Sequence, residues 1–230
     1  MLKLNYENLE EIKKRNNSDE CLAQNMFEGK GLPEKILQFG EGNFLRGFVD
    51  WKIHLMNKNN LFNGRVVVVQ PIQYGLADML NEQNGLYSLF LHGIKDGKTI
   101  EQKEIISSIS RGINPYKEFC EYVKCAENPD LRVIVSNTTE AGIAYNPSDK
   151  FDDEPPASFP GKLTVLLYKR YEAFNGDVSK GFIILPCELI DRNGDNLKKI
   201  VFRLAEEWKL GNDFINWLEN ANYFLNTLVD

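Results

Sequence analysis

The sequence lacks the features that define several large classes of protein. No apolar stretch in its 230 residues approaches the ~20 residues of a membrane-spanning helix, and the polar amino terminus has no apolar signal-peptide core. The formal net charge is −6, so the excess of positive charge that marks nucleic-acid-binding proteins is absent. We therefore expect no membrane partner, no nucleic-acid partner and a location in the cytoplasm.

Cysteine and histidine are also scarce. The four cysteines form no Cys-x-x-Cys pair, and neither His54 nor His92 has a cysteine beside it, so no metal site built from a local motif is expected. A chain of this length can bury a sizeable core without a disulfide framework. Apolar residues make up 43% and charged residues 26%, which is the balance of globular proteins rather than of disordered chains or coiled coils.

What the sequence does contain is an alternation of strand-like and helix-like segments. Strand-like runs lie at 35–39, 65–70, 131–137 and 180–189, and those at 65–70 and 131–137 have the continuous β-branched pattern of strands buried on both faces of a parallel sheet. Helical patterns lie at 6–15, 43–58, 114–128, 162–174, 195–210 and 212–228. This order predicts an α/β fold with a Rossmann-like, doubly wound, mostly parallel sheet, in which residues 1–31 form a helical extension at the amino terminus.

Several local expectations accompany this fold. Asp96-Gly97 separates two strand-like runs at 85–93 and 98–109, which predicts an antiparallel hairpin inserted into the fold. Pro115 is expected in the first turn of the helix at 114–128. The apolar face of the helix at 43–58 is expected to consist of four large side chains at helical spacing, Phe44, Phe48, Trp51 and Leu55. An acidic, proline-rich surface loop is expected at 147–160.

The stretch "LPEKILQFGEGNFLRGFVDW", residues 32–51, joins a strand to a helix through two glycines. In a dinucleotide-binding turn, glycines let the chain reverse tightly and approach a pyrophosphate, which the amino terminus of the next helix then holds. Gly40 and Gly42 fit this pattern, but Leu45 stands where a third glycine would allow close packing of helix on strand. The pattern therefore favours a phosphate turn and a purely structural turn about equally, and predicts a differently shaped turn or a more distant helix.

Polar residues at other strand ends are further candidates. Gln70 follows the second strand, where Asp or Glu commonly accepts a hydrogen bond from ribose; glutamine leaves NAD and NADP both open, and equally fits a strand end without a ligand. After residues 133–135, the cluster from Asn137 and Thr138 to Glu140 can offer donors and acceptors to a cofactor, or can begin a capped helix.

The last strand ends in "ILPCELIDRNGDNL", which is again polar. Cys187 and Glu188 could face a substrate, and Asp195 is expected to cap the following helix. The motif "FPGKLT" contains Lys162, which we expect to be a solvated lysine at the start of a helix.

Taken together, these segments resemble the long-chain polyol dehydrogenases, a family that includes mannitol dehydrogenase and the oxidoreductases of hexuronate breakdown. The matching stretches occur in family order from residue 32 to nearly the end of the chain: "LPEKILQFGEGNFLRGFVDW", "GRVVVVQPI", "NGLYSLFLHG", "VIVSNTTEAGI", "FPGKLT" and "ILPCELIDRNGDNLK". The resemblance implies a Rossmann-like NAD-binding domain spanning residues 1–230, with NADP not excluded, and a helical catalytic domain that is absent from this chain.

The resemblance also implies where a cofactor would bind. The cofactor loop would comprise Phe39, Gly40, Glu41, Gly42, Asn43 and Phe44, with Arg46 beside it. Gln70 would lie near the ribose, Asn137 and Thr138 near the nicotinamide, and Cys187 and Glu188 on the substrate side.

Two features of the chain bear on the reaction that the resemblance implies. Polyol-specific members tend to have Cys-Asp-Asn where this chain has Cys187, Glu188 and Leu189, which favours a sugar-acid substrate and interconversion of D-altronate and D-tagaturonate. The family's catalytic base is a lysine in a Lys-x4-Asn-x2-His pattern, which neither histidine of this chain completes. The resemblance thus implies that this chain holds no catalytic residue and needs the missing domain as its partner. Mannonate (fructuronate) or mannitol oxidation, and a non-catalytic dinucleotide sensor, are the alternatives.

Overall fold

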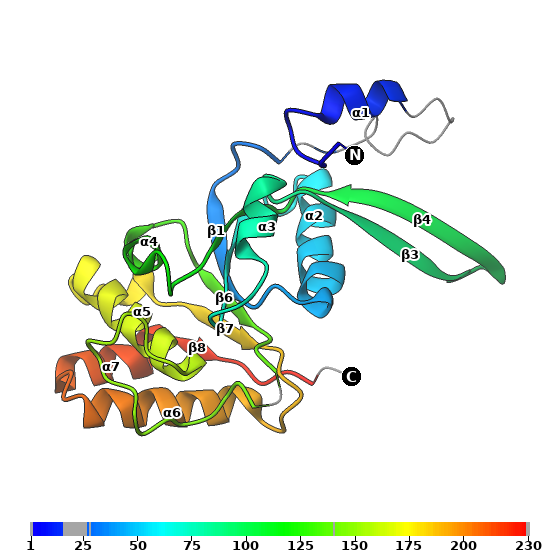
Figure 1. Cartoon of the computed structure of the whole chain (residues 1–230). Coiled ribbons are helices and arrows are strands. Elements are labelled where there is room, and N and C mark those ends of the chain that lie inside the picture. Colours follow the sequence, from blue (N-terminus) through cyan, green and yellow to red (C-terminus); the bar gives the residue numbers. More distant parts are fainter. Residues whose placement is uncertain (1, 16–26, 28, 140, 229–230) are drawn as a thin grey trace.

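The computed structural model describes residues 2–15, 27, 29–139 and 141–228. They form a six-stranded sheet with helices on both faces, from which a long hairpin projects (Figure 1). The sheet strands are β1 (Glu34–Phe39), β2 (Arg65–Val69), β5 (Ile109–Ile113), β6 (Val133–Ser136), β7 (Ile183–Pro186) and β8 (Tyr223–Phe224). Their order is β5-β2-β1-β6-β7-β8 and every neighbouring pair is parallel, so the predicted doubly wound sheet is confirmed.

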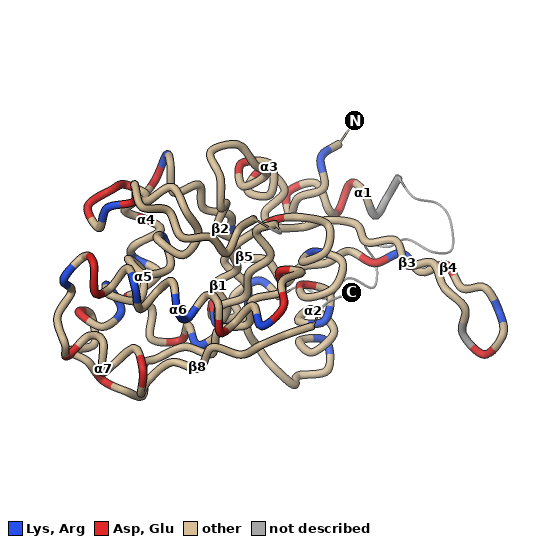
Figure 2. Tube along the Cα trace, turned by 90° about the horizontal axis from the view of Figure 1, so that it is seen from below, with Lys and Arg blue, Asp and Glu red and all other residues tan. Residues whose placement is uncertain are grey.

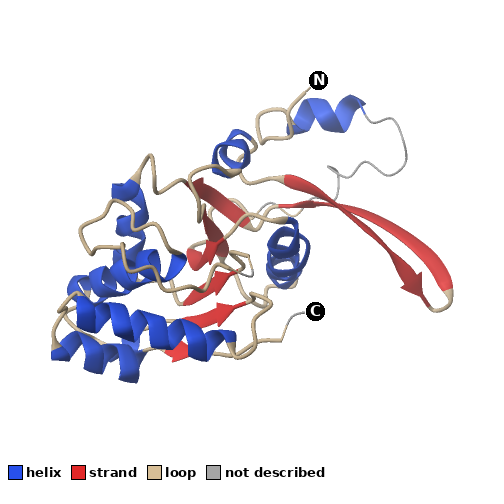
Figure 3. Ribbon diagram, turned by 60° about the horizontal axis from the view of Figure 1, so that its bottom comes forward, coloured by secondary structure: helices blue, strands red, loops and turns tan. Residues whose placement is uncertain are grey.

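The helices cover the sheet in two layers (Figure 3). The helical segments are α1 (Leu9–Arg15), η1 (Leu45–Val49), α2 (Asp50–Lys58), α3 (Ala77–Glu82), α4 (Phe119–Lys124), η2 (Cys125–Glu127), α5 (Phe159–Ala173), η3 (Val178–Lys180), α6 (Asn193–Glu207) and α7 (Asn212–Ala221). Within the part of the chain that the structure describes, none of them is long and apolar enough to span a membrane. Along the coloured part of the trace, which covers the described residues, acidic and basic residues are interspersed without a basic stripe (Figure 2).

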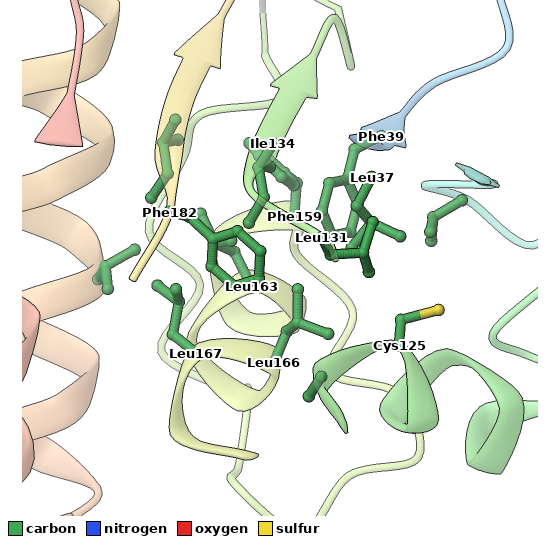
Figure 4. Close-up of a cluster of buried hydrophobic side chains, with 14 of the residues drawn as sticks. Leu37, Phe39, Cys125, Leu131, Ile134, Phe159, Leu163, Leu166, Leu167 and Phe182 are labelled. Atoms are coloured by element: carbon green, nitrogen blue, oxygen red, sulfur yellow. The ribbon is translucent and has the colours of Figure 1, made fainter. Parts of the chain in front are cut away.

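Two separate cores lie on the two faces of the sheet, because side chains alternate along a strand. Leu37 and Val67 belong to the larger core, which contains side chains from α4, α5, α6 and α7. Ile36 and Val66 belong to the second core, beneath α2 and α3. Figure 4 shows the larger core, where the leucines of α5 pack beneath β1 and β6. The valines of β2 are therefore buried on both faces, as the sequence predicts.

The predicted hairpin is also confirmed. Strands β3 (Tyr87–Lys95) and β4 (Lys98–Ile106) pair antiparallel across Asp96 and Gly97, which both have positive φ, as a tight two-residue hairpin turn requires. Only the base of the hairpin is buried, and the rest extends away from the body of the molecule (Figure 1).

The expected apolar face of the helix at 43–58 is confirmed only in part: Phe44 and Trp51 pack against the second core, but Phe48 lies outside it. Leu45 and Ile53 are buried, whereas Phe48 is 51% exposed. The physical reason is the π-helical turn η1: its wider i to i+5 spacing shifts the phase of the residues that follow. The same turn stands where the missing third glycine predicts an altered connection.

At three further places the chain departs from the predicted elements by more than a shift of a few residues at an end. Pro115 lies in a turn before α4, because the side chain of Asn114 accepts a hydrogen bond from the Tyr116 N–H and closes that turn first. The run at 98–109 is split: β4 ends at Ile106, and β5 begins at Ile109 in the main sheet. The final helix ends at Ala221, and β8 follows because the chain pairs with β7 there.

Candidate functional site

The residues that directly follow β1, β2, β6 and β7 form one row along the carboxyl edge of the sheet. Each donates its backbone N–H to the last residue of a neighbouring strand: Gly40 to Val69, Gln70 to Ile113, Asn137 to Phe39 and Cys187 to Ser136, at 2.7 to 3.0 Å. Four candidates separated by up to 147 positions in sequence are thus brought together. Open α/β sheets bind ligands at this edge, where the strand order reverses between β1 and β6.

The two glycines of the turn differ in how much space surrounds them. Gly40 has φ +117°, and a Cβ there would lie 2.7 Å from the Asn137 carbonyl oxygen and 3.1 Å from Leu45 Cδ1, so only glycine fits. A Cβ on Gly42 would meet no atom within 4 Å. The side chain of Phe39 is fully buried against Phe159, with ring centroids 4.9 Å apart, so only the backbone of Phe39 borders the turn.

Arg46 braces the turn from the following helix. Its Nε donates to the Glu41 carbonyl oxygen at 2.9 Å, and its Nη2 donates to Asn43 Oδ1 at 2.8 Å. Its guanidinium also lies over the ring of Tyr87, 5.7 Å from the centroid. Phe44 stacks on the exposed Phe48 at 5.5 Å. The turn is therefore held in shape by side chains on its own helix.

Glu41 reaches from the turn to the loop after β2. Its Oε1 accepts a hydrogen bond from the Leu76 N–H at 3.2 Å, and Gly75 lies so close that a Cβ there would be 2.1 Å from Oε1. Its Oε2 is buried and has no hydrogen-bond partner among the described residues. Burial raises the pKa of this carboxyl group, because the charged form loses solvation.

Gln70 does not present a free side chain to a ligand. It is 2% exposed, and its Nε2 donates to the carbonyl oxygens of Ile72 and Gln73 at 2.8 and 3.0 Å. Its Oε1 accepts from the Ala77 N–H at 3.3 Å. In this structure its polar atoms shape the loop after β2, so the predicted ribose contact would require breaking these bonds.

Gln38 and Asp50 form a buried pair beneath the turn, which no sequence pattern indicates. Gln38 Nε2 donates to the Gly40 carbonyl oxygen at 3.1 Å and to Asp50 Oδ2 at 3.2 Å. Gln38 Oε1 and Asp50 Oδ1 are buried without a hydrogen-bond partner in the described chain. Burial raises the pKa of Asp50 to about 7. Charged residues within helical patterns are usually solvated, so no local sequence signal indicates that Asp50 is buried.

Glu188, for which the sequence suggests a place on the substrate side, is a buried carboxylate with hydrogen-bond donors for both oxygens. It is 1% exposed; its Oε1 accepts from the Thr138 N–H and Oγ1 at 3.0 and 2.9 Å, and its Oε2 accepts from Ser136 Oγ at 3.0 Å. Cys187 is also buried, which raises its pKa to about 11, and its carbonyl oxygen accepts from Asn137 Nδ2 at 2.6 Å. These residues join the ends of β6 and β7, and Glu140 lies outside the described residues.

Asn193, rather than Asp195, organises the start of α6. Its Nδ2 donates to the carbonyl oxygens of Pro186 and Glu188, and its Oδ1 accepts from the Thr227 N–H at 3.0 Å. The predicted cap is wrong, because the Asp195 carboxylate pairs with Arg192 at 2.6 Å instead.

Lys162 is also placed differently from the prediction. It is fully buried rather than solvated, and its Nζ donates to the Ala157 carbonyl oxygen at 2.8 Å and to the Tyr116 hydroxyl at 3.0 Å. Burial lowers its pKa to about 8. The proline-rich loop folds back over α5, which is why a lysine in the first turn of that helix loses its solvent.

A pocket of about 310 Å³ opens at the carboxyl ends of β2 and β5. Its lining includes Gln70, Tyr74, Asn114 and Tyr116, together with an ion pair between Asp78 and Lys117 at 2.6 Å. Among the described residues, no three His, Cys, Asp or Glu side chains come close enough together to hold a metal ion.

Comparison with known proteins gives a consistent result. The family model described as the mannitol dehydrogenase Rossmann domain matches residues 34–230. Altronate oxidoreductases of Escherichia coli O1:K1 and O9:H4 are each 51% identical over 205 residues, which cover 89% of this chain and 42% of the relative. The chain therefore spans less than half the length of these curated relatives.

Two solved structures share the fold. Pseudomonas fluorescens mannitol 2-dehydrogenase, solved as a ternary complex with NAD and D-mannitol, superposes with a TM-score of 0.75 and 19% identity, covering 97% of this chain and 46% of that one. A substrate-free D-sorbitol dehydrogenase gives 0.73 and 19% identity, covering 89% and 44%.

Proposed function

The chain belongs to the mannitol dehydrogenase family, and from this premise we propose that it is the dinucleotide-binding part of an altronate oxidoreductase. The reaction is the NAD-dependent interconversion of D-altronate and D-tagaturonate, so the substrate is a small sugar acid. The observation that carries the proposal is the 51% identity to altronate oxidoreductases over 205 residues, against 19% to the mannitol and sorbitol enzymes. Free thiols at Cys120, Cys125 and Cys187 agree with a cytoplasmic location, which is part of the proposal.

The carboxyl edge of the sheet fits NAD. The open space at Gly42 leaves room for a pyrophosphate to approach the backbone of the turn, which Arg46 holds in shape. Asn137 and Thr138, across the strand-order reversal from the turn, would border the nicotinamide. When bound, NAD supplies the acceptor for the hydride that leaves the alcohol carbon.

The role of this chain is to bind and orient the cofactor rather than to move the proton. Oxidation of an alcohol needs a general base within hydrogen-bond reach of the hydroxyl. The lysine pattern of the family is absent from the sequence, and Lys162 is enclosed by Ala157 and Tyr116. We assign the base to the remaining part of the longer protein, its helical domain, and expect no turnover from the 230-residue chain alone.

The test is the reductase activity of the full-length protein with tagaturonate, fructuronate and fructose, each with NADH and with NADPH. We expect the highest kcat/KM for tagaturonate with NADH. Fructuronate is the second candidate, and a higher rate with it would move the assignment to mannonate oxidation. Equal rates on all three substrates would refute the altronate assignment, and no turnover on any would leave the dinucleotide sensor as the better reading.

A further inference from the structure

The carboxylate that commonly receives the adenosine ribose is missing from its usual place. In folds with this strand order, an Asp or Glu at the end of the second strand accepts hydrogen bonds from the ribose hydroxyls. Gln70 occupies that position, and all three of its hydrogen bonds go to the backbone of residues 72–77. A ribose that lies beside the end of β2 therefore needs an acceptor from elsewhere.

The side chain of Glu41 extends to this same place from the turn. β1 and β2 are adjacent parallel strands, so the turn after β1 and the loop after β2 lie next to each other at the carboxyl edge. The Glu41 carboxylate spans the two, with Oε1 on the Leu76 N–H. Gly75 lies between this carboxylate and the side chain of Gln70. A Cβ on Gly75 would be 2.1 Å from Glu41 Oε1 and 2.7 Å from Gln70 Cδ. The missing Cβ at Gly75 is what lets the carboxylate reach the end of β2.

One oxygen of this carboxylate has no partner. Glu41 is 8% exposed, and its Oε2 makes no hydrogen bond to any described residue. A buried carboxylate oxygen without a donor destabilises the fold, so its presence calls for a role outside folding. Glu188, at the other half of the edge, has donors for both oxygens. Glu41 Oε2 is thus an acceptor available to a ligand.

We propose that Glu41 accepts the hydrogen bond from the adenosine ribose 2′-hydroxyl and thereby selects NAD over NADP. This rests on the proposed function, since it names the residue that recognises one part of the cofactor. A hydroxyl donates to a carboxylate in a strong, charge-assisted bond. The 2′-phosphate of NADP is mostly doubly charged at neutral pH and brings this negative charge against the same carboxylate, so it is repelled.

Access to Oε2 requires the loop after β2 to shift. Residues 72–75 are exposed and have no regular secondary structure, and Gly75 lies directly against the carboxylate. Loops of this kind move at small cost in free energy compared with the sheet that carries them. Leu76 directly precedes α3 and lies outside the exposed residues 72–75, so its N–H keeps Oε1 in place when those four residues shift.

The experiment is fluorescence titration of the 230-residue chain with NADH and with NADPH, using the wild type and Glu41→Gln. The amide keeps the shape and the acceptor for the Leu76 N–H, but replaces the charged oxygen by a donor. We expect the NADH dissociation constant to rise about 10-fold and the preference for NADH over NADPH to fall at least 10-fold. A residue that only caps the loop would change the midpoint of thermal unfolding without changing this preference.

Two further variants keep the test decisive. Gly75→Ala places a Cβ 2.1 Å from Oε1 and displaces the carboxylate without removing it, so we expect the NADH preference to fall here too. Glu34→Gln removes a partly buried carboxylate at the opposite end of β1, where it pairs with Arg111 at 2.9 Å, and should leave the preference unchanged.

The outcomes separate the two proposals. If the wild type binds NADH and the preference is the same in Glu41→Gln and Gly75→Ala, the role of Glu41 is refuted and the proposed function stands. If the wild type and the full-length protein both bind neither nucleotide, the proposed function fails, and the role of Glu41 fails with it.

Discussion

The two halves of the carboxyl edge differ in how fully their buried carboxylates are hydrogen-bonded. On the β6 and β7 side, three donors from Ser136 and Thr138 satisfy both oxygens of Glu188. On the β1 and β2 side, Glu41 and Asp50 each keep a buried oxygen without a hydrogen bond in the described structure. Folding therefore gives both carboxylate oxygens of Glu188 a hydrogen-bond donor, whereas it leaves one oxygen of Glu41 and one of Asp50 without a donor in the described structure. We attribute this difference to a scaffold role for the first half and to the proposed cofactor binding for the second.

The largest effect is expected where the two halves touch. Gly40→Ala would place a Cβ 2.7 Å from the Asn137 carbonyl oxygen at φ +117°, so both the turn and the end of β6 must shift. We expect a loss of about 4 kcal/mol in the free energy of unfolding and loss of measurable NADH binding. Urea denaturation and NADH titration measure the two effects.

Gly31→Ala is the matched control for this variant. Gly31 also has positive φ, at +95°, but a Cβ there meets no atom within 4 Å. It should lose only about 1 kcal/mol, which is the backbone penalty alone. Equal losses in the two variants would show that contact between the halves does not matter.

Removing the satisfied carboxylate tests the scaffold half. Glu188→Leu leaves the donors of Ser136 and Thr138 without an acceptor in a buried place, and we expect a loss of about 3 kcal/mol by urea denaturation. Glu188→Gln can still accept from Thr138 and donate to the Ser136 hydroxyl, so it should lose only about 1 kcal/mol. A leucine variant as stable as the glutamine variant would contradict the scaffold role.

Asp50 tests the other half of the edge, where removing a buried carboxylate is expected to stabilise the fold rather than to destabilise it. Burial raises its pKa from an ordinary 3.8 to about 7, so the folded state holds the proton more tightly than the unfolded chain. Ionisation of Asp50 therefore opposes folding increasingly as pH rises from about 4 through 7.

Asp50→Asn removes this penalty. We expect the stability gained by the variant to be larger at pH 8 than at pH 5 by roughly 2 kcal/mol, measured by urea denaturation at both pH values. Nearby charges do not reverse the sign, because the attraction of Arg46 lowers the pKa less than burial raises it. An equal gain at the two pH values would show that Asp50 does not carry the pH dependence.

The smallest effect concerns the thiols. Burial raises the pKa of Cys187 to about 11 and that of Cys125 to about 12, so neither should react with iodoacetamide in the native protein at pH 8. Among the three cysteines that the structure describes, Cys120 is the exposed one and should be modified first, as mapped by mass spectrometry. Rapid modification of Cys187 would show that the end of β7 is open, and would restore the substrate-facing role that the sequence predicted for it.

Much of the fold could be predicted because its signals are local. A run of four valines marks β2, and Asp96-Gly97 marks the hairpin turn, since each depends only on residues beside it. The boundary between β4 and β5 could not be predicted, because it depends on where the chain leaves the hairpin and pairs with β2 in the main sheet. Nor could β8, whose pairing with β7 joins residues 40 positions apart.

The candidate site was predictable to the same degree. The sequence placed Gly40, Gln70, Asn137 and Cys187 at strand ends, and strands that run parallel necessarily bring such ends to one edge. It misplaced Lys162 and did not indicate that Glu188 is buried, because charged side chains are usually solvated and only a folded loop or neighbouring strand can bury them.

By itself, the sequence determined the alternation of strands and helices and the need for glycine after β1. These follow from side-chain shape and backbone freedom, which are properties of a residue and its immediate neighbours. Only the tertiary structure decided that Glu188 is satisfied and that Glu41 is not. Their donors come from Thr138 and Leu76, at 50 and 35 positions' distance, and the pairing of a buried charge depends on which distant backbone the fold brings beside it.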